Sequence, residues 1–190
     1  MTLKLFYRCF ERPLILCLSV NILSSCVAGS GAASASDLAL SEKEVPAKVF
    51  YCNDGDTCHI GLSQGSVWFN VRLFGVDAPE TGKKRSAKAG QPLGEEAKDF
   101  LNSLVKGKDV TVIQADLDQY NRPVVEIYFE RKNVNLMLVE KGLAEMYRGK
   151  SKRLDRSKFE AAEAKAKADK IGIWGLKNYE SPSLFRKSQR

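Results

Sequence analysis

Histidine is almost absent from this chain, because His59 is the only one among its 190 residues. A histidine pair, which is a common ligand set for zinc and other transition metals, is therefore excluded. The ligands near the charged segments described below are oxygens, and oxygen ligands favour hard ions such as Ca²⁺ or Mg²⁺. No internal repeat is present either, so the length favours one domain with appendages.

A long hydrophobic run is also missing. The stretch from Leu14 to Leu23 is mostly apolar but too short for a comfortable membrane span. It follows a positive start and precedes small residues, which is the layout of a secretory signal peptide. Leu23-Ser24-Ser25-Cys26 resembles a bacterial lipobox, in which the cysteine is lipidated. Cleavage near Ala33-Ser34-Ala35 is the alternative, and we favour Cys26 because a cysteine at that place needs a reason.

The rest of the chain has the composition of an ordinary soluble domain, with 44% hydrophobic and 28% charged residues. Its net charge of +7 favours a polyanionic partner such as nucleic acid, or an anionic membrane. A solvated, lysine-rich surface is the alternative. We expect a signal peptide over residues 1–25 and a flexible tether over 26–44. A folded domain over 45–179 and a basic C-terminal tail over 180–190 would follow. The predicted location is exported, as a cell-envelope lipoprotein or a periplasmic or secreted protein.

Hydrophobic periodicity predicts five short strands, with a helix between the third and the fourth. The expected strands cover residues 45–52, 57–62, 66–74, 110–115 and 124–129. Helices are expected after Gly94, over 135–141 and over 156–170, the last with its lysines and glutamates facing solvent. This order fits an α+β fold, mainly a five-stranded OB-type barrel, with three helices.

Cys52 and Cys58 are the cysteines that remain in the predicted domain, and they flank the turn 53–57 symmetrically. Opposed positions on a hairpin have the spacing that a disulfide needs, and an exported protein can keep such a bond. We therefore predict a disulfide that stiffens the turn. Two half-buried thiols are the alternative.

Two acidic turns could meet at one site. Asp56 lies in the turn just described, and Asp77 follows the third predicted strand. If the two carboxylates converge, a cation is needed between them, and Ca²⁺ or Mg²⁺ suits oxygen ligands. The alternative for Asp54-Gly55-Asp56 is a plain hairpin turn, in which Asp-Gly is common.

Other charged residues could complete a site for a phosphodiester. A guanidinium can hold two phosphate oxygens at once, which suits Arg72 and Arg122. Glu80, beyond Pro79, could orient or deprotonate an attacking water. Tyr120 and Tyr147 could contact a base or a phosphate, or simply be surface aromatics. Further candidates for backbone contacts are Lys83 and Lys84.

Six segments match a known family in order and spacing. They are DGDT at 54–57, RLFGVDAPE at 72–80, GEEA at 94–97, DQYNR at 118–122, VNLMLVEKGLA at 134–144 and IGIW at 171–174. With these segments the chain resembles the staphylococcal nuclease (thermonuclease) family.

The resemblance implies Ca²⁺-dependent hydrolysis of DNA and RNA to products with 3′-phosphates. By position, Asp56, Asp77 and the backbone carbonyl of Ala78 look like metal ligands. The catalytic residues by the same comparison are Arg72, Glu80 and Arg122, and Tyr120 is similar to the tyrosine beside the phosphate. We expect single-stranded or frayed nucleic acid as partner, a membrane contact only through a lipid anchor, and a monomer.

The chain departs from the family pattern near these positions. Gln119 stands where the family has a lysine, and Asn121 and Pro123 replace glycines. The segment 145–150 is shorter, which makes the match of Tyr147 to a substrate-stacking tyrosine a hypothesis. A noncatalytic nucleic-acid-binding barrel is the competing interpretation, and a purely structural lipoprotein would leave the charged set unexplained.

Overall fold

The computed structural model describes residues 43–62, 67–82, 89–149 and 156–189, which belong to one compact unit spanning Ala32–Arg190. Cys26, Lys83 and Lys84 lie outside the described residues, as do the predicted signal peptide and nearly all of the tether. Among the described residues, no helix is long and apolar enough to cross a membrane.

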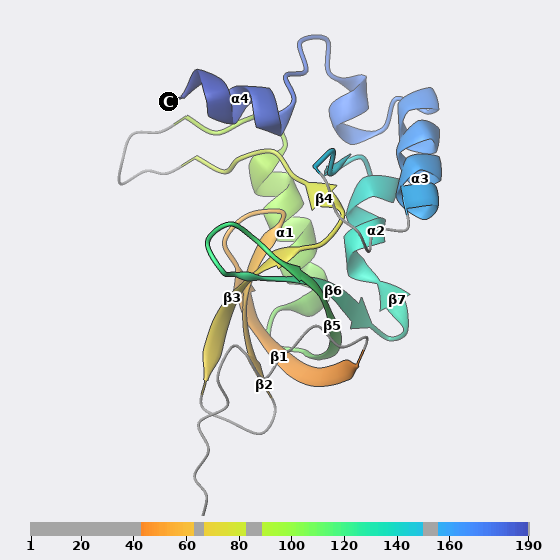
Figure 1. Cartoon of the computed structure of the whole chain (residues 1–190). Helices are drawn as coiled ribbons and strands as arrows, with labels where there is room; N and C mark the ends of the chain where they lie inside the picture. Colours follow the sequence, from red (N-terminus) through yellow and green to blue (C-terminus); the bar gives the residue numbers. More distant parts are fainter. Residues whose placement is uncertain (1–42, 63–66, 83–88, 150–155, 190) are drawn as a thin grey trace, which may run out of the picture. The chain divides into compact units, whose positions relative to one another are not determined.

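Five strands close into a barrel at the centre of this unit (Figure 1). The strands are β1 (Glu44–Cys52), β2 (Thr57–Leu62), β3 (Trp68–Leu73), β5 (Asp109–Leu117) and β6 (Pro123–Phe129). They follow the order β3-β2-β1-β5-β6 with antiparallel neighbours, and a parallel pairing of β3 with β6 closes the ring. Closure leaves no long open edge on these strands. The predicted OB-type barrel in an α+β fold is confirmed.

The alternation predicted for β3 is present and fixes the register of the barrel. Phe69, Val71 and Leu73 are buried in the core, whereas Trp68 is exposed on the other face. Because side chains alternate along a strand, Arg72 lies on the outer face, next to the end of β3. Thr57 pairs with Arg72 in the ladder between β2 and β3, so the turn before β2 lies beside it.

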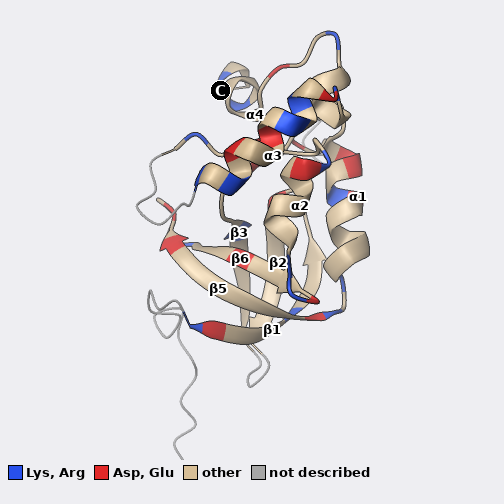
Figure 2. Cartoon of the chain, turned by 90° about the vertical axis from the view of Figure 1, so that its right-hand side faces the viewer, with Lys and Arg blue, Asp and Glu red and all other residues tan. Residues whose placement is uncertain are grey.

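The helices pack around the barrel. They are α1 (Gly94–Val105), α2 (Val134–Glu140), α3 (Arg156–Ala168) and α4 (Pro182–Ser188), with a 3₁₀ turn at Gly172–Gly175. The three predicted helices correspond to α1, α2 and α3, while α4 lies in the segment that we predicted only as a basic tail. Charged residues, coloured blue and red in Figure 2, occur along α3. Its Glu163 is buried, however, so the prediction that its glutamates face solvent is wrong at that position.

Three two-residue strands were not predicted. β4 (Val76–Asp77) pairs with β8 (Glu145–Met146), which places Asp77 opposite Glu145, and β7 (Lys132–Asn133) pairs with β6. Strands this short carry no readable periodicity. The pairing of β4 with β8 nevertheless positions the segment that follows β3.

Asn135 joins α2 to the barrel and is completely buried. Its side-chain oxygen accepts from the backbone N–H of Ile127, and its amide donates to the carbonyls of Phe74 and Val125. Every polar atom of the amide group therefore has a partner, as a buried amide requires. These bonds hold the chain in place just after β3.

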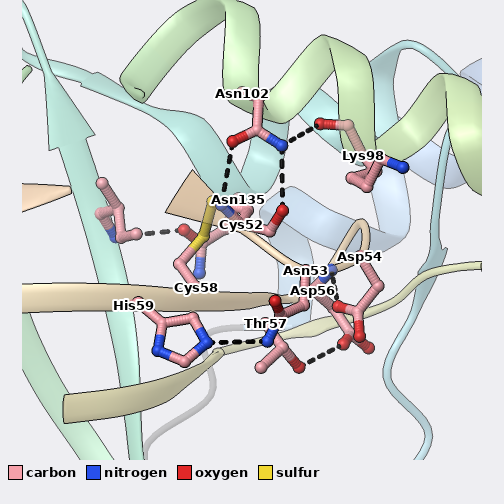
Figure 3. The surroundings of a disulfide bond; sticks show 11 residues. Cys52, Asn53, Asp54, Asp56, Thr57, Cys58, His59, Lys98, Asn102 and Asn135 are labelled. Atoms are coloured by element: carbon pink, nitrogen blue, oxygen red, sulfur yellow. Dashed lines mark hydrogen bonds between the residues drawn. A yellow bond between two sulfur atoms is a disulfide. The ribbon is translucent and has the colours of Figure 1, made fainter. Parts of the chain in front are cut away.

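A disulfide joins Cys52 and Cys58 across the acidic turn (Figure 3). Asn102 on α1 clamps the same place, because it accepts from the backbone N–H of Cys52 and donates to its carbonyl. The side chain of Asn53 bonds to His59 on the other side of the turn, at 2.8 Å. The turn that carries Asp56 is thus fixed to α1 and closed on itself.

Candidate active site

Asp56 and Asp77 converge, and Arg72 lies between them. One nitrogen of Arg72, Nη2, is 2.9 Å from Oδ2 of Asp56 and 3.0 Å from Oδ1 of Asp77. The two carboxylates are 5% and 4% exposed, so they are shielded from bulk water. Burial alone would lower the pKa of Arg72, but the two carboxylates raise it overall, and its charge is secure. The two predicted acidic turns therefore form one site.

Close packing aligns the turn with the segment after β3. A side chain at Gly55 would lie 2.6 Å from Cβ of Ala78 and 2.8 Å from Cβ of Ala97, distances that real atoms do not tolerate. The backbone N–H of Ala78 donates to Oδ2 of Asp56 at 3.4 Å. The absence of a side chain at Gly55 therefore lets Asp56 approach the Asp77–Ala78 segment.

Asp54 lies in the same turn but has a different environment. Its Oδ1 accepts from the backbone N–H of Asp56. Burial, followed by the charge of Asp56, raises the pKa of Asp54 to about 7. Asp54 therefore holds its proton more readily than an ordinary aspartate, because a second negative charge beside Asp56 is unfavourable.

Glu80 is placed by Gln91, a residue that the sequence did not single out. Gln91 makes two hydrogen bonds with the backbone of Glu80. Its side-chain oxygen accepts from the Glu80 N–H, and its backbone N–H donates to the Glu80 carbonyl. Gly94, at the start of α1, lies against the same carbonyl so closely that a side chain would clash with it. The backbone at Glu80 is fixed, while its carboxylate remains partly exposed.

Arg186 on α4 is the largest unforeseen element of the site. Its Nη2 donates to both oxygens of Asp77 at 2.9 Å, and its Nη1 donates to Oε1 of Glu80 at 2.8 Å. Burial would lower its pKa, but Glu80 and Asp77 raise it, and the guanidinium is charged. A basic tail predicted from composition gave no sign of which residue would reach the site.

Arg122 reaches the site from the loop between β5 and β6. Asp118 organises this loop, since its Oδ1 accepts from the backbone N–H groups of Tyr120 and Arg122, and its Oδ2 accepts from Nε of Arg122 at 2.7 Å. Burial would raise the pKa of Asp118, but these donors lower it overall. Asn121 has a φ of 58°, a conformation that asparagine tolerates well in place of glycine. The substitution therefore preserves a glycine-like turn.

A cavity of about 480 Å³ lies beside the acidic residues and is lined by the three arginines that surround them. Residues that line it include Arg72, Arg122, Arg186, Gln119, Tyr120 and Tyr147. Tyr120 is 67% exposed, and the guanidinium carbon of Arg122 lies 5.7 Å from its ring centroid. Likewise, the guanidinium carbon of Arg72 lies 5.8 Å from the ring centroid of Tyr147. Both tyrosines border the cavity, so the structure brings together all the predicted aromatic and cationic residues that it describes.

Tyr147 and Glu145 are held by the neighbouring elements. The backbone N–H of Tyr147 donates to the carbonyl of Gly75 at 2.9 Å. Buried Glu163 on α3 accepts from the N–H of Met146, and Tyr179 donates to Glu145. Burial raises the pKa of Glu145, which lies opposite Asp77. The short strand β8 is therefore tied to α3 on one side and to the site on the other.

The donor set fits a hard cation, although it is sparse. Among the described residues, no cluster of three or more His, Cys, Asp or Glu side chains has the arrangement of a metal cage. Asp56 and Asp77 nevertheless bring carboxylate oxygens to one point, and a positively charged nitrogen of Arg72 lies there. Two carboxylates and a backbone carbonyl would need water and substrate oxygens to complete a Ca²⁺ shell of six to eight ligands.

An OB-type barrel with buried carboxylates and guanidinium groups beside an open cavity has the chemistry to bind a phosphodiester. Comparison with known proteins agrees with this chemistry. The family described as "Staphylococcal nuclease homologue" matches residues 70–175, more than half of the chain. The chain belongs to the staphylococcal nuclease family, as its sequence motifs predicted.

Several curated relatives are similar over the same region. An "Uncharacterized endonuclease" of Haemophilus influenzae is 32% identical over 152 residues, covering 80% of this chain and 79% of that protein. A "Probable endonuclease LCL3" of Eremothecium gossypii is 38% identical, covering 62% of this chain and 45% of that protein. "Staphylococcal-like nuclease CAN1" of Arabidopsis thaliana is 35% identical, covering 64% of this chain and 34% of that protein. The chain thus spans about half the length, or less, of several relatives.

Proposed function

We propose that the protein is a Ca²⁺-dependent nuclease of low sequence specificity, which hydrolyses phosphodiester bonds of DNA and RNA and leaves 3′-phosphates. The observation that carries the proposal is the convergence of Asp56, Arg72 and Asp77 beside a cavity that also contains Arg122. Family membership and the endonuclease names of the relatives support it.

The cation would be held by Asp56, Asp77 and the carbonyl of Ala78. When bound, it would polarise a phosphate oxygen and neutralise negative charge that develops on the phosphate. The buried carboxylates are positioned in advance by Gly55 and by the short strand β4, so little reorganisation is needed.

Arg72 and Arg122 would bind the phosphate from two sides of the cavity. In the structure both are paired with carboxylates, Arg72 with Asp56 and Asp77, and Arg122 with Asp118. Entry of a cation beside Asp56 and Asp77 would free Arg72 for the phosphate. Arg122 keeps part of its guanidinium available, because Asp118 binds it through Nε. Two planar guanidinium groups can then stabilise the equatorial oxygens as charge accumulates.

Glu80 would orient the attacking water or accept its proton. Its backbone is fixed by Gln91, and its carboxylate accepts from Arg186, which also binds Asp77. A carboxylate with such a fixed backbone can hold a water in line with the phosphorus atom.

The open cavity and the exposed ring of Tyr120 favour a single strand as substrate. Exposed aromatic side chains stack on unpaired bases without reading their sequence, and a net charge of +7 attracts the backbone of DNA and RNA alike. Frayed duplex ends would serve for the same reason.

Digestion of matched single-stranded DNA, duplex DNA and RNA by the purified protein tests this function. Each substrate is incubated with Ca²⁺, with Mg²⁺ and with a chelator, and the product ends are analysed for 3′-phosphate. We expect cleavage with Ca²⁺, fastest on single strands, and none with chelator. Nucleic acid that binds but is not cleaved at any metal concentration would instead establish the noncatalytic binding module.

We also propose that the protein is exported as a monomer and anchored through Cys26. The proposal rests on the positive start, the short apolar stretch and the lipobox-like segment, all of which lie outside the described residues. Mass spectrometry of the mature N-terminus tests it. A diacylated Cys26 is expected, an N-terminus near Ala35 would indicate ordinary secretion, and an intact Met1 would contradict export. Size-exclusion chromatography with light scattering checks the monomer.

A further inference from the structure

Arg186 on α4 binds the two carboxylates that matter most for the proposed chemistry. Its guanidinium donates to both oxygens of Asp77 and to Glu80. Asp77 is 109 residues away in sequence, and Arg186 lies beyond the segment that matches the family, 70–175. One side chain of the C-terminal helix therefore covers both the proposed cation ligand and the proposed water-orienting residue.

We propose that Arg186 is a built-in competitive plug, which occupies Asp77 in the resting protein and must leave before a divalent cation can bind there. The proposal concerns regulation of the same site and rests on the proposed function for the roles of Asp77 and Glu80. The competition itself depends only on the contacts of Arg186 and can be measured without nucleic acid.

The hydrogen bonds at Asp77 leave little room for a cation. A carboxylate offers about four lone-pair positions. Oδ1 of Asp77 accepts from both Arg72 and Arg186, and Oδ2 accepts from Arg186. Three positions are thus used by two guanidinium groups. The one position that remains is on Oδ2, and a cation there would lie against the Arg186 guanidinium, which holds both oxygens.

The charges lead to the same exchange. Arg186 adds a positive charge directly against Asp77 and Glu80. It thereby lowers the negative charge that attracts a divalent cation to these two carboxylates. A guanidinium and a divalent cation at the same carboxylate would also repel each other. Arg186 and the cation are therefore alternatives at Asp77.

The attachment of α4 suits a part that can leave. Pro182 is the buried residue of the helix, whereas Leu184 is 54% exposed, so apolar packing contributes little. The start of the helix is better fixed, because the side chain of Gln91 donates to the carbonyl of Glu180 at 2.8 Å. Since Gln91 also binds the backbone of Glu80, the helix can swing away from the site and remain anchored next to it. Figure 1 shows α4 beside the described parts of the chain between β4 and α1, residues 78–82 and 89–93.

Calcium binding to the purified protein, measured by titration calorimetry without nucleic acid, tests the plug. We expect Arg186→Ala to bind Ca²⁺ on the order of ten-fold more tightly, because a competing bound state is removed. Lys187→Ala is the matched control, since it removes one positive charge from an exposed position of the same helix. We expect its affinity to stay within about two-fold of the parent, because exposed charges are screened. Equal affinities for the parent and Arg186→Ala would overturn the proposal.

Hydrogen exchange of the unaltered protein gives a second test that no substitution can disturb. A helix of seven residues depends on its tertiary contacts, so release of Arg186 should let it fray. Addition of Ca²⁺ should therefore speed exchange of amides in residues 183–188 and leave those of α1 unchanged. Amides of α4 that remain equally protected at saturating Ca²⁺ would refute displacement.

Activity assays separate the plug from the proposed nuclease function. Cleavage with an unchanged Ca²⁺ affinity in Arg186→Ala would refute the plug alone. Tighter Ca²⁺ binding by Arg186→Ala, together with no cleavage by the parent protein, would refute the nuclease alone. Slower cleavage by Arg186→Ala at saturating Ca²⁺, with unchanged Ca²⁺ affinity, would show that Arg186 serves the substrate phosphate instead.

Discussion

Arg72 and Arg122 bring the same chemical group to the same cavity, but their surroundings differ. Arg72 projects from a barrel strand between two carboxylates that are almost completely buried. Arg122 projects from a loop, and its partner Asp118 belongs to that same loop. One guanidinium is thus part of the folded core of the site, and the other is carried by a self-contained turn. A substitution should therefore cost stability and activity together at Arg72, and activity alone at Arg122.

Arg72→Ala should have the largest effect. It leaves buried Asp56 without its charge partner and Asp77 with Arg186 alone, which costs about 3 kcal/mol of unfolding free energy. It removes a phosphate ligand as well. Urea unfolding and single-turnover cleavage measure the two losses. Arg72→Lys is the control, because it keeps the charge but loses the planar fork, so stability should recover more than rate. An Arg72→Ala protein as stable as the parent would show that Arg72, like Arg122, does not contribute to the stability of the fold.

Arg122→Ala should lower the cleavage rate constant by about 10²–10³-fold, as loss of one preorganised donor to developing charge does. Its side chain is 33% exposed and its ion pair lies at the surface, so unfolding free energy should change by less than about 1 kcal/mol. The same two assays apply. An unchanged rate would exclude Arg122 from the reaction.

Glu80→Gln tests the residue between these two regions. The amide keeps the shape and can still hold a water weakly, but it cannot accept a proton, so the rate should fall by at least about 10²-fold. Binding of a non-cleavable oligonucleotide should remain close to the parent value. Equal losses of binding and rate would assign Glu80 to the support of the loop instead.

Asp118→Asn and Asp118→Ala form a graded pair for the loop. Asparagine can still accept from the backbone N–H groups of Tyr120 and Arg122 but loses the ion pair, so we expect a loss of a few-fold in kcat/KM. Alanine also loses the turn, and about ten-fold is expected, in line with removal of hydrogen bonds to a charged group. Equal effects would show that the ion pair alone positions Arg122.

The same carboxylate predicts a pH dependence. The pKa of Asp118 is lowered in the folded protein. Its contribution to the stability of the loop is therefore complete at any pH above its unfolded pKa, about 3.9. That contribution is lost as the pH falls through the lower folded value. Loop order, followed by the Arg122 Nε–H signal in NMR, should persist at mildly acidic pH.

Reduction of the Cys52–Cys58 bond should have the smallest effect. The closed loop is short, so the chain-entropy contribution is only about 2 kcal/mol, and Asn102 still holds Cys52. Cleavage should fall slightly and the melting temperature by several degrees. The control is the doubly substituted Cys52→Ser, Cys58→Ser protein, which should match the reduced one with or without reductant.

The part of the site on and directly after β3 could be predicted, because its residues lie close together in the sequence. Arg72, Asp77 and Glu80 fall within nine residues, and the alternation of β3 assigns Arg72 to the outer face. The convergence of Asp56 with them depends on the hairpin between β1 and β2, which composition and spacing indicated correctly. These residues and their neighbours specify one local geometry.

The features of the site that could not be predicted depend on contacts between segments that are distant in the sequence. Gln91 and Arg186 are, respectively, 11 and 106 residues from Glu80, and no periodicity marks either one. β4 and β8 are two residues long, so only their mutual pairing, Val76 with Met146 and Asp77 with Glu145, defines them. Glu163 looks like any other charged residue of an exposed helix until β8 is placed next to it. Tertiary packing, which local patterns do not encode, determined these positions.

Gly55 has a consequence for any attempt to redesign the site. The turn is in van der Waals contact with Ala78 and Ala97 and leaves no volume for a methyl group. The distance between the Asp56 and Asp77 backbones therefore cannot be widened to suit a larger ion without moving α1 itself.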